Sequence, residues 1–396
     1  MTDVFMNTYH RLPVTFSRGE GAWLFDTGGK KYLDFSSGIA VNCLGHAYPP
    51  LVKAIAEQAA RLNHVCNYYQ SNTTAAFAEK LTAACAPVGM KRVFLANSGA
   101  EANEGAFKIA RKYSLVRHGP NRHRIVTLKG GFHGRTVTTL AATGQDVFHK
   151  DFGPFTEGFA YVPAGDIEAL DRALDADTVA GFLVEAVQGE SGIRPQESAY
   201  IRRAAELCAE RDILLIFDEV QCGVGRTGSF LACEAYGVKP DIVTLAKGLA
   251  GGIPVGAALA GEKAADILQI SDHGSTFGGN PVAAAAGLVV LETVNCPSFL
   301  AEITRKGEKL QSVVRGWGHP KVRELRGRGL MIGIDIEDEA WPILERGVAA
   351  AGTPPAANPG LLILSAGQKT LRLLPPYIIA DTEIEEGLEL LRGLLS

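Results

Sequence analysis

The sequence predicts an α/β protein: a large domain with a mostly parallel central sheet, and a smaller α/β domain built from the N- and C-terminal segments. Between residues 92 and 242, short apolar runs rich in Val, Ile and Leu alternate with longer segments of helical periodicity. This alternation is typical of parallel strands joined by crossover helices. Both ends of the chain lack it. We place the N-terminal segment, the large domain and the C-terminal segment at residues 1–50, 51–285 and 286–396.

Strand-like segments are also predicted in the two ends of the chain. A hairpin is expected near the N-terminus, because the runs 21–26 and 31–35 flank a Thr-Gly-Gly turn. The last hundred residues combine helical segments with strand-like runs at 330–336 and 369–374, and residues 352–359 form a Pro-rich loop. A mixed α/β domain is therefore expected from these two ends.

The central sheet is predicted from five buried strands, at residues 93–96, 125–128, 182–185, 214–218 and 242–246. Between them, apolar residues recur at three- and four-residue spacing, which predicts helices with one apolar face. The two clearest series are Ala102, Ala106, Ile109, Ala110 and Tyr113, and Ile201, Ala204, Ala205 and Cys208. We expect such helices to enclose the sheet.

Composition excludes several classes of protein. The charged fraction is 21% and the net charge is −4 with no basic run, which argues against nucleic-acid binding. Seven cysteines without a C-x-x-C pair indicate reduced thiols rather than disulfides or zinc. The apolar run 281–291 is shorter than the ~20 residues of a membrane span, and residues 1–4 lack a signal-peptide pattern. We expect a cytoplasmic protein without a metal.

The strongest local signal for chemistry is a lysine and an aspartate at the ends of two predicted strands. Asp218 ends one apolar run and Lys247 directly follows another. Ligands of open α/β sheets bind beyond the carboxyl ends of the strands. A lysine there can be desolvated, which favours the neutral amine that condenses with an aldehyde. Pyridoxal 5'-phosphate (PLP) needs such a lysine, and an acid facing its ring nitrogen.

A phosphate site is predicted where residues 97–101 connect a strand to a helix. Ser98, Gly99 and Ala100 would present free backbone N–H groups at the start of this helix, where the helix dipole also favours an anion. Alone, such a turn is more often an ordinary helix cap than a phosphate site. No G-x-G-x-x-G fingerprint accompanies it, which disfavours a dehydrogenase.

Several sequence blocks resemble the class III aminotransferases in order and spacing. They occupy residues 97–104, 131–136, 184–190, 218–221, 245–248, 273–281 and 371–376. The resemblance covers nearly the whole chain and is strongest to the acetylornithine aminotransferase branch. It implies the PLP-dependent transferase fold of type I, with PLP as cofactor.

The resemblance assigns roles to the residues around the cofactor. It implies that Lys247 carries the cofactor covalently, that Asp218 pairs with the ring nitrogen and that Gln221 contacts the ring hydroxyl oxygen. Phe132 would stack on the ring, as a flat aromatic can at small entropic cost. Ser98, Gly99 and Ala100 match the phosphate-binding turn. Thr276 matches a residue that reaches the phosphate from the other subunit, which implies a homodimer with active sites at the interface.

Four further residues are implied to bind substrates. Arg135 matches an arginine that holds the substrate α-carboxylate, a task suited to a planar cation, and Ser275 matches a neighbouring contact. Arg372 matches a second arginine for the dicarboxylate acceptor, and Glu190 matches the glutamate that covers it while the amine donor is bound. Such a pair lets one pocket accept an amine end and then a carboxylate end.

The donor is expected to be N2-acetyl-L-ornithine, with 2-oxoglutarate as acceptor, in a step of arginine biosynthesis. Ornithine aminotransferases carry a tyrosine at the position of Gly38, whereas glycine leaves room for an acyl group. N-succinylornithine and N-succinyl-diaminopimelate stay open as donors, because acyl chains are separated by only ~10- to 200-fold. Ornithine and 4-aminobutyrate aminotransferases are further alternatives, and a non-catalytic PLP-binding protein is one of another class. Gln70-Ser71 and Ala186 depart from the usual family residues.

Overall fold

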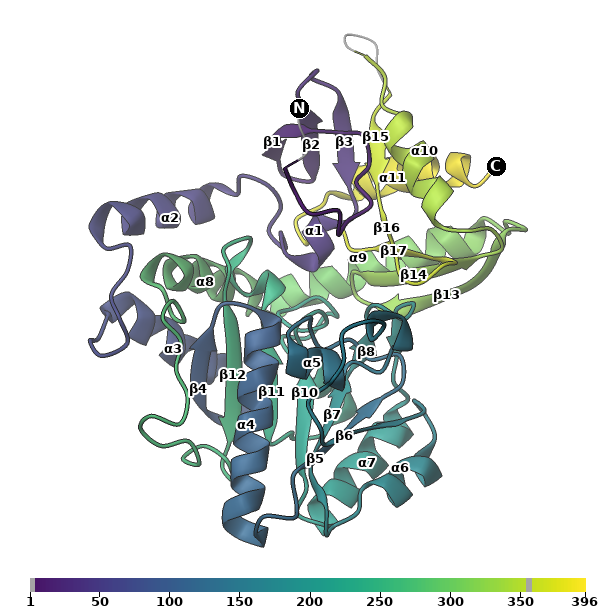
Figure 1. Cartoon of the computed structure of the whole chain (residues 1–396). Coiled ribbons are helices and arrows are strands. Elements are labelled where there is room, and N and C mark those ends of the chain that lie inside the picture. The colour runs from purple at the N-terminus through teal and green to yellow at the C-terminus, as the bar shows by residue number, and fades with distance from the viewer. Residues whose placement is uncertain (1–3, 354–357) are drawn as a thin grey trace.

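The computed structural model describes residues 4–353 and 358–396. Most of the predicted Pro-rich loop, residues 354–357, lies outside this range. Figure 1 shows a large sheet-containing unit below a smaller unit, in which the N-terminal strands lie beside C-terminal elements.

A seven-stranded sheet forms the centre of the large unit. Its strand order is β4-β12-β11-β10-β7-β5-β6, and only β12 runs antiparallel to its neighbours. The strands are β4 (Met90–Ala96), β5 (Arg124–Leu128), β6 (Phe159–Val162), β7 (Val179–Glu185), β10 (Leu214–Asp218), β11 (Ile242–Leu245) and β12 (Gly256–Gly261). All five predicted strands are confirmed. β6 and β12 were not predicted, because β6 is short and the Gly- and Ala-rich β12 lacks the β-branched residues typical of strands.

Helices cover both faces of this sheet. Successive side chains of a strand point to opposite faces, so Leu214 and Ile216 pack in one apolar cluster with helix α4, while Leu215 and Phe217 pack in another. The second cluster includes helices α3, α7 and α8. Both predicted apolar series lie in the helices expected, α4 and α7. The helices of this unit are α2 (Pro49–Arg61), α3 (Asn72–Ala84), α4 (Gly99–His118), α5 (Val137–Ala142), α6 (Ile167–Ala173), α7 (Ser198–Glu210) and α8 (Pro281–Val294).

The smaller unit joins the two ends of the chain. β3 of the predicted hairpin pairs in parallel with β15, and the hairpin itself is confirmed. A second four-stranded sheet has the order β13 (Val322–Arg328), β14 (Met331–Ile336), β17 (Thr370–Leu373) and β16 (Leu364–Ser365), and contains both predicted C-terminal strands. Leu33 and Phe35 share an apolar core with Ile332, Leu371 and Leu388. The boundaries at residues 50 and 285 stay predictions.

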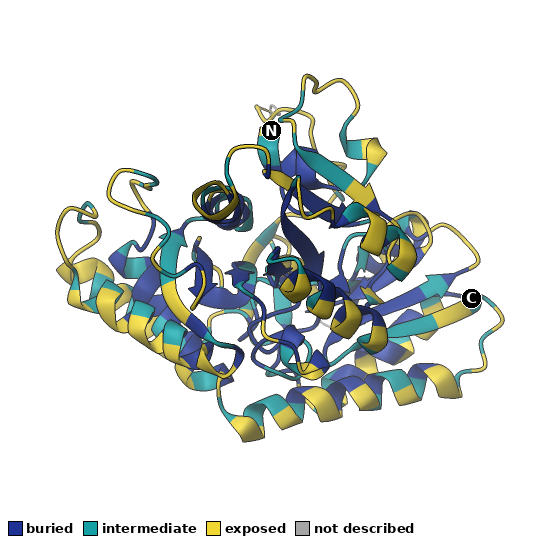
Figure 2. Ribbon diagram, turned by 90° about the horizontal axis from the view of Figure 1, so that it is seen from below, coloured by how far each residue is buried: buried dark blue, intermediate teal, exposed yellow. Residues whose placement is uncertain are grey.

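The elements of the smaller unit and its connections are β1 (Phe16–Glu20), β2 (Trp23–Asp26), β3 (Lys31–Asp34), α9 (Pro297–Gly316), β13 (Val322–Arg328), β14 (Met331–Ile336), α10 (Trp341–Ala349), β15 (Gly360–Leu362), β16 (Leu364–Ser365), β17 (Thr370–Leu373) and α11 (Asp381–Leu394). Figure 2 shows that the outer faces of the long helices are exposed while the strands between them are buried. Within the described residues, no single helix is long and apolar enough to cross a membrane, although α8 and α9, bent by 75° at their junction, meet that criterion as a pair.

Candidate active site

A cavity of about 360 Å³ lies at the carboxyl edge of the large sheet, where ligands of such sheets bind. The ends of β4, β7, β10 and β11 all contribute to it. It is lined by Val41, Asn97, Ser98, Gly99, Ala100, Phe132, His133, Gly134, Glu185, Asp218, Val220, Gln221, Ala246, Lys247, Gly252, Ile253, Pro254 and Val255. Seven of the predicted site residues therefore meet in one place.

Lys247 is separated from the end of β11 by Ala246 alone and begins the short 3-10 helix η4 (Lys247–Ala250). Its backbone has a φ of 46°, a left-handed conformation that costs a non-glycine residue free energy. Burial lowers the pKa of its amine, with Glu190 opposing and Arg372 adding to the shift. A lowered pKa favours the neutral amine, which is the form that reacts with an aldehyde.

Asp218 is buried at the end of β10 and is held by three donors. Its Oδ2 accepts hydrogen bonds from Asn103 Nδ2 at 2.8 Å and from His133 Nδ1 at 2.8 Å. Its Oδ1 accepts from the backbone N–H of Val220 at 3.0 Å. Thr244 in turn orients Asn103 by donating to its Oδ1 at 2.8 Å. This network fixes the carboxylate at the cavity wall, as an acid facing a ring nitrogen requires.

Sequence analysis did not single out Asn103, His133 or Glu185, although each lies in a block that carried the resemblance. Their side chains are buried, and polar residues inside apolar surroundings were the available signal. Glu185 ends β7 and lines the cavity. Burial raises its pKa to about 7, with His133 opposing the shift and Asp218 adding to it.

The first turn of α4 opens into the cavity and suits an anion. Ser98 caps the helix by accepting a hydrogen bond from the N–H of Glu101 at 3.2 Å, and the N–H groups at the start of a helix have no partner inside it. A Cβ on Gly99 would lie 2.6 Å from Val220 Cγ1, so a side chain there would push into Val220. The predicted turn of Ser98, Gly99 and Ala100 thus fits a phosphate.

Arg372, Glu190 and Gln221 form a connected group beside the cavity. Arg372 Nη1 donates to Glu190 Oε1 at 2.5 Å and to Gln221 Oε1 at 3.2 Å. Gln221 Nε2 donates to Glu190 Oε1 at 3.3 Å. Burial would raise the pKa of Glu190, but the Arg372 guanidinium outweighs it and holds that pKa below its usual range. The structure therefore holds Glu190 on Arg372, as the resemblance implies for the amine-binding state.

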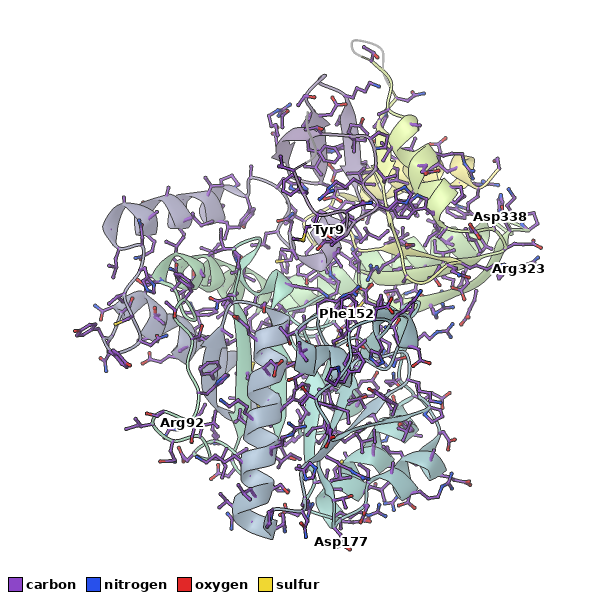
Figure 3. The ribbon with its side chains drawn as sticks, in the orientation of Figure 1. Tyr9, Arg92, Phe152, Asp177, Arg323 and Asp338 are labelled. Atoms are coloured by element: carbon purple, nitrogen blue, oxygen red, sulfur yellow. The ribbon has the colours of Figure 1, made fainter. Side chains whose placement is uncertain are left out.

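Besides Glu190 and Arg372, three predicted substrate or cofactor residues lie outside the cavity lining. Arg135 is exposed and lines a neighbouring hollow with Tyr9 and Phe152, both labelled in Figure 3. Its guanidinium stacks on the ring of Phe148, 4.1 Å from the centroid. Ser275 and Thr276 line another hollow. Ser275 Oγ accepts from Asn97 Nδ2 at 3.1 Å, so this loop borders the first cavity without Thr276 entering it.

Gly38 lies in a left-handed turn, α1 (Ser37–Ala40), that precedes the cavity residue Val41. Its φ is 60°. A Cβ there would approach nothing closer than Asn42 Nδ2, at 3.5 Å. A Cβ at this position would therefore make only ordinary van der Waals contacts, and room for an acyl group there stays a prediction.

Comparison with known proteins matches residues 4–395 to the family described as Aminotransferase class-III. The chain is 46% identical to an acetylornithine aminotransferase of Caldanaerobacter subterraneus subsp. tengcongensis, over 99% of this chain and 97% of that protein. Among solved structures, N-acetylornithine aminotransferase from Stenotrophomonas maltophilia is 37% identical with a TM-score of 0.83, covering 98% of this chain and 96% of that one. An ornithine aminotransferase from Toxoplasma gondii, with PLP at its active site, is 31% identical with a TM-score of 0.92, covering 99% and 92%.

Proposed function

Because the chain belongs to the class III aminotransferases, which are PLP-dependent enzymes, we propose which amine it uses. The proposed reaction transfers the δ-amino group of N2-acetyl-L-ornithine to 2-oxoglutarate. The products are N-acetyl-L-glutamate 5-semialdehyde and L-glutamate, a step of arginine biosynthesis. The similarity to acetylornithine aminotransferases over nearly the full length supports this donor.

The cavity residues fit PLP, and this fit is the observation that carries the proposed transamination. Lys247 would hold it covalently, Asp218 would pair with its ring nitrogen and Phe132 would cover its ring. Ser98, Gly99 and Ala100 would hold its phosphate, and Gln221 would contact its hydroxyl oxygen. When bound, PLP supplies an electron sink that stabilises negative charge on the substrate carbon.

Proton transfer is assigned to Lys247. Once the donor amine has replaced it, the free lysine amine can take the proton from the substrate carbon and return it at another atom. Its lowered pKa, caused first by burial, keeps more of the amine in the neutral form that accepts a proton.

Substrate positioning is assigned to Arg135 and to the Arg372–Glu190 pair. Arg135 would bind the α-carboxylate of the donor, so that the δ-amine points to Lys247. While an amine donor is bound, Glu190 neutralises Arg372, and the 2.5 Å contact between them supports this state. When 2-oxoglutarate binds, Glu190 would move away and leave Arg372 for the second carboxylate.

The glycine at position 38, which carries no side chain, supports an acylated donor. An acylated nitrogen carries no charge and needs no ionic partner. Leaving a buried polar group unpaired costs roughly 1 to 3 kcal/mol, and a charged α-ammonium costs more. Ornithine, N-succinylornithine, N-succinyl-diaminopimelate and 4-aminobutyrate are the alternatives, and a PLP-binding protein without turnover is the alternative of another class.

We further propose a homodimer whose active sites lie at the subunit interface. Tyr68, Ile270 and Phe277 are exposed apolar side chains, with 93%, 98% and 60% of their surface open to solvent. Tyr68 and Ile270 line the same hollow as Thr276. Exposed apolar groups gathered in this way are typical of interfaces. Thr276 would reach the partner's phosphate site from there.

A cytoplasmic location is proposed as well. The seven cysteines are all unpaired, and five of them are buried. Unpaired thiols are usual where the surroundings are reducing.

A panel of donors with 2-oxoglutarate tests the substrate assignment. Steady-state kcat/KM is measured for N-acetylornithine, N-succinylornithine, N-succinyl-diaminopimelate, ornithine and 4-aminobutyrate. We expect the highest value for N-acetylornithine. A clear preference for free ornithine would overturn the assignment, and no turnover with any donor would favour the non-catalytic alternative.

A further inference from the structure

Two buried glutamates lie at the cavity edge of the sheet, and the proposed reaction uses neither. Glu185 ends β7 and pairs in register with Asp218 of the neighbouring β10, while Glu219 follows Asp218 directly. Backbone N–H groups outside the sheet hold the side chains of both. The two glutamates differ in which segments of the chain they hold.

Glu185 joins two segments of the chain, one at Phe132 in the cavity lining and one at Gly189. Its Oε2 accepts a hydrogen bond from the N–H of Phe132 at 3.1 Å, and its Oε1 accepts one from the N–H of Gly189 at 3.2 Å. Phe132 is the ring expected to cover the cofactor. Gly189 immediately precedes Glu190, the residue that covers Arg372. A single carboxylate therefore touches the backbone of both.

The Gly189 segment has little room to shift while this contact exists. A Cβ on Gly189 would lie 2.5 Å from the side chain of Gln221, so the backbone there runs directly against that side chain. The carbonyl of Gly189 also approaches Arg372 Nη1, at 3.5 Å. Fixing the N–H of Gly189 thus fixes the start of the Glu190 side chain relative to Arg372.

We propose that Glu185 is a positioning residue that ties Phe132 to the Gly189–Glu190 backbone and so holds Glu190 over Arg372. This inference rests on the proposed function, because it assigns Glu190 the covering of Arg372 during amine binding. The tie needs a side chain that accepts two hydrogen bonds in two directions. A carboxylate does so, whereas an amide has one accepting oxygen and presents N–H groups at its other end.

In the E185Q variant the side chain keeps nearly the same shape but can accept only one of the two hydrogen bonds, so either the Phe132 or the Gly189 backbone should be released. With Gly189 less firmly held, Glu190 leaves Arg372 more often. Glutamate, which needs a free Arg372, should then gain relative to N-acetylornithine, which needs it covered. Loss of one net hydrogen bond corresponds to a change of about 2- to 10-fold in that preference. A general loss of structure would lower both rates and leave their ratio unchanged.

E219Q provides a matched control. Glu219 is equally buried and accepts hydrogen bonds from the N–H groups of Ala232 at 2.8 Å and Cys233 at 2.7 Å. Neither amide lies in the cavity lining, nor does Glu219. This variant thus removes a comparable buried carboxylate without touching the proposed tie.

Two measurements on the full-length protein test the proposal. Hydrogen–deuterium exchange, without substrate, should accelerate in peptides with Phe132 or Gly189 for E185Q, and in peptides with Ala232 and Cys233 for E219Q. Single-turnover rates of the PLP-loaded enzyme with glutamate and with N-acetylornithine should give a changed ratio for E185Q alone. Failure of the wild type to use N-acetylornithine would refute the proposed function, whereas the exchange experiment would still test the tie.

Unchanged exchange at both Phe132 and Gly189 in folded E185Q would overturn the proposal, as would an unchanged ratio of rates. If E185Q does not fold, E185D is measured instead, because its shorter carboxylate cannot reach both amides. For E185D, faster exchange at Phe132 or Gly189 together with a changed ratio of rates would support the proposal, and no change in either would overturn it.

Discussion

Asp218 and Lys247, which are assigned to the cofactor, and Arg135, which is assigned to the substrate, occupy different surroundings. Asp218 is buried at a strand end and held by three hydrogen bonds, and Lys247 follows the next strand. Arg135, which is assigned to the substrate carboxylate, is exposed and lies on a loop. Groups on packed strands keep a precise geometry, while exposed loop groups can adapt to ligands. We infer that the sheet edge fixes the chemistry and the loops set which substrate reaches it.

The substitution K247A should have the largest effect on activity. It removes both the covalent attachment and the proton carrier, and proton transfer alone contributes up to about 10⁴-fold. We expect kcat to fall by about 10⁴-fold or more for every donor. The measurement is the rate at which glutamate is formed from 2-oxoglutarate. If K247A kept more than a hundredth of the wild-type activity, the inference that the sheet edge fixes the chemistry would be contradicted.

The next largest effect is expected for D218N. The amide has the shape of the carboxylate but lacks the charge that would hold a proton on the cofactor's ring nitrogen. Loss of one preorganised electrostatic contact typically costs about 10²–10³-fold in rate, and kcat should fall by that factor for all donors alike. A selective effect on one donor would show that Asp218 acts on the substrate instead.

A smaller and selective effect is expected for R135K. Lysine keeps the charge but not the two-pronged geometry, and hydrogen bonds to charged groups contribute about 1.5–3 kcal/mol. The KM for N-acetylornithine should rise about 10- to 100-fold with kcat little changed. N-acetyl-1,4-diaminobutane, which lacks the α-carboxylate, is the control substrate. If its KM rises equally, Arg135 does not bind the carboxylate.

The smallest effect concerns stability and pH. Burial raises the pKa of Glu219 to about 7, with the N–H groups of Ala232 and Cys233 opposing, whereas its ordinary value is 4.5. The stability contributed by the uncharged form is complete below pH 4.5 and is lost as pH rises through about 7. Replacing Glu219 by Gln should remove this loss. The difference in Tm between wild type and variant should therefore change by about 2–4 °C between pH 5 and 8; a constant difference would contradict it.

The sequence alone predicted the sheet and its cavity edge well, because long buried strands and amphipathic helices have strong periodic patterns. Strand β12 was missed since its Gly and Ala residues look like a loop, and its small side chains have a packing reason: a Cβ on Gly256 would lie 2.2 Å from the carbonyl oxygen of Ser98. Such a close approach is visible only in three dimensions.

Only some residues of the candidate site could be predicted, because contacts between distant parts of the chain are visible only in three dimensions. Lys247 and Asp218 stand at strand ends, so their meeting follows from topology. Asp218 is held by Asn103, which lies on a helix 115 positions away in the sequence, and by His133, which lies on a loop 85 positions away. No spacing rule connects these residues. Thr276 depends on a second subunit, which a single sequence does not describe.

Reduction of the PLP-loaded enzyme with borohydride, followed by peptide mass mapping, tests the central assignment most directly. Borohydride makes the bond between cofactor and lysine permanent, so the modified peptide identifies the attachment site. We predict the cofactor's mass on the peptide that contains Lys247 and on no other. A modified peptide without Lys247, or no modification at all, would contradict the account.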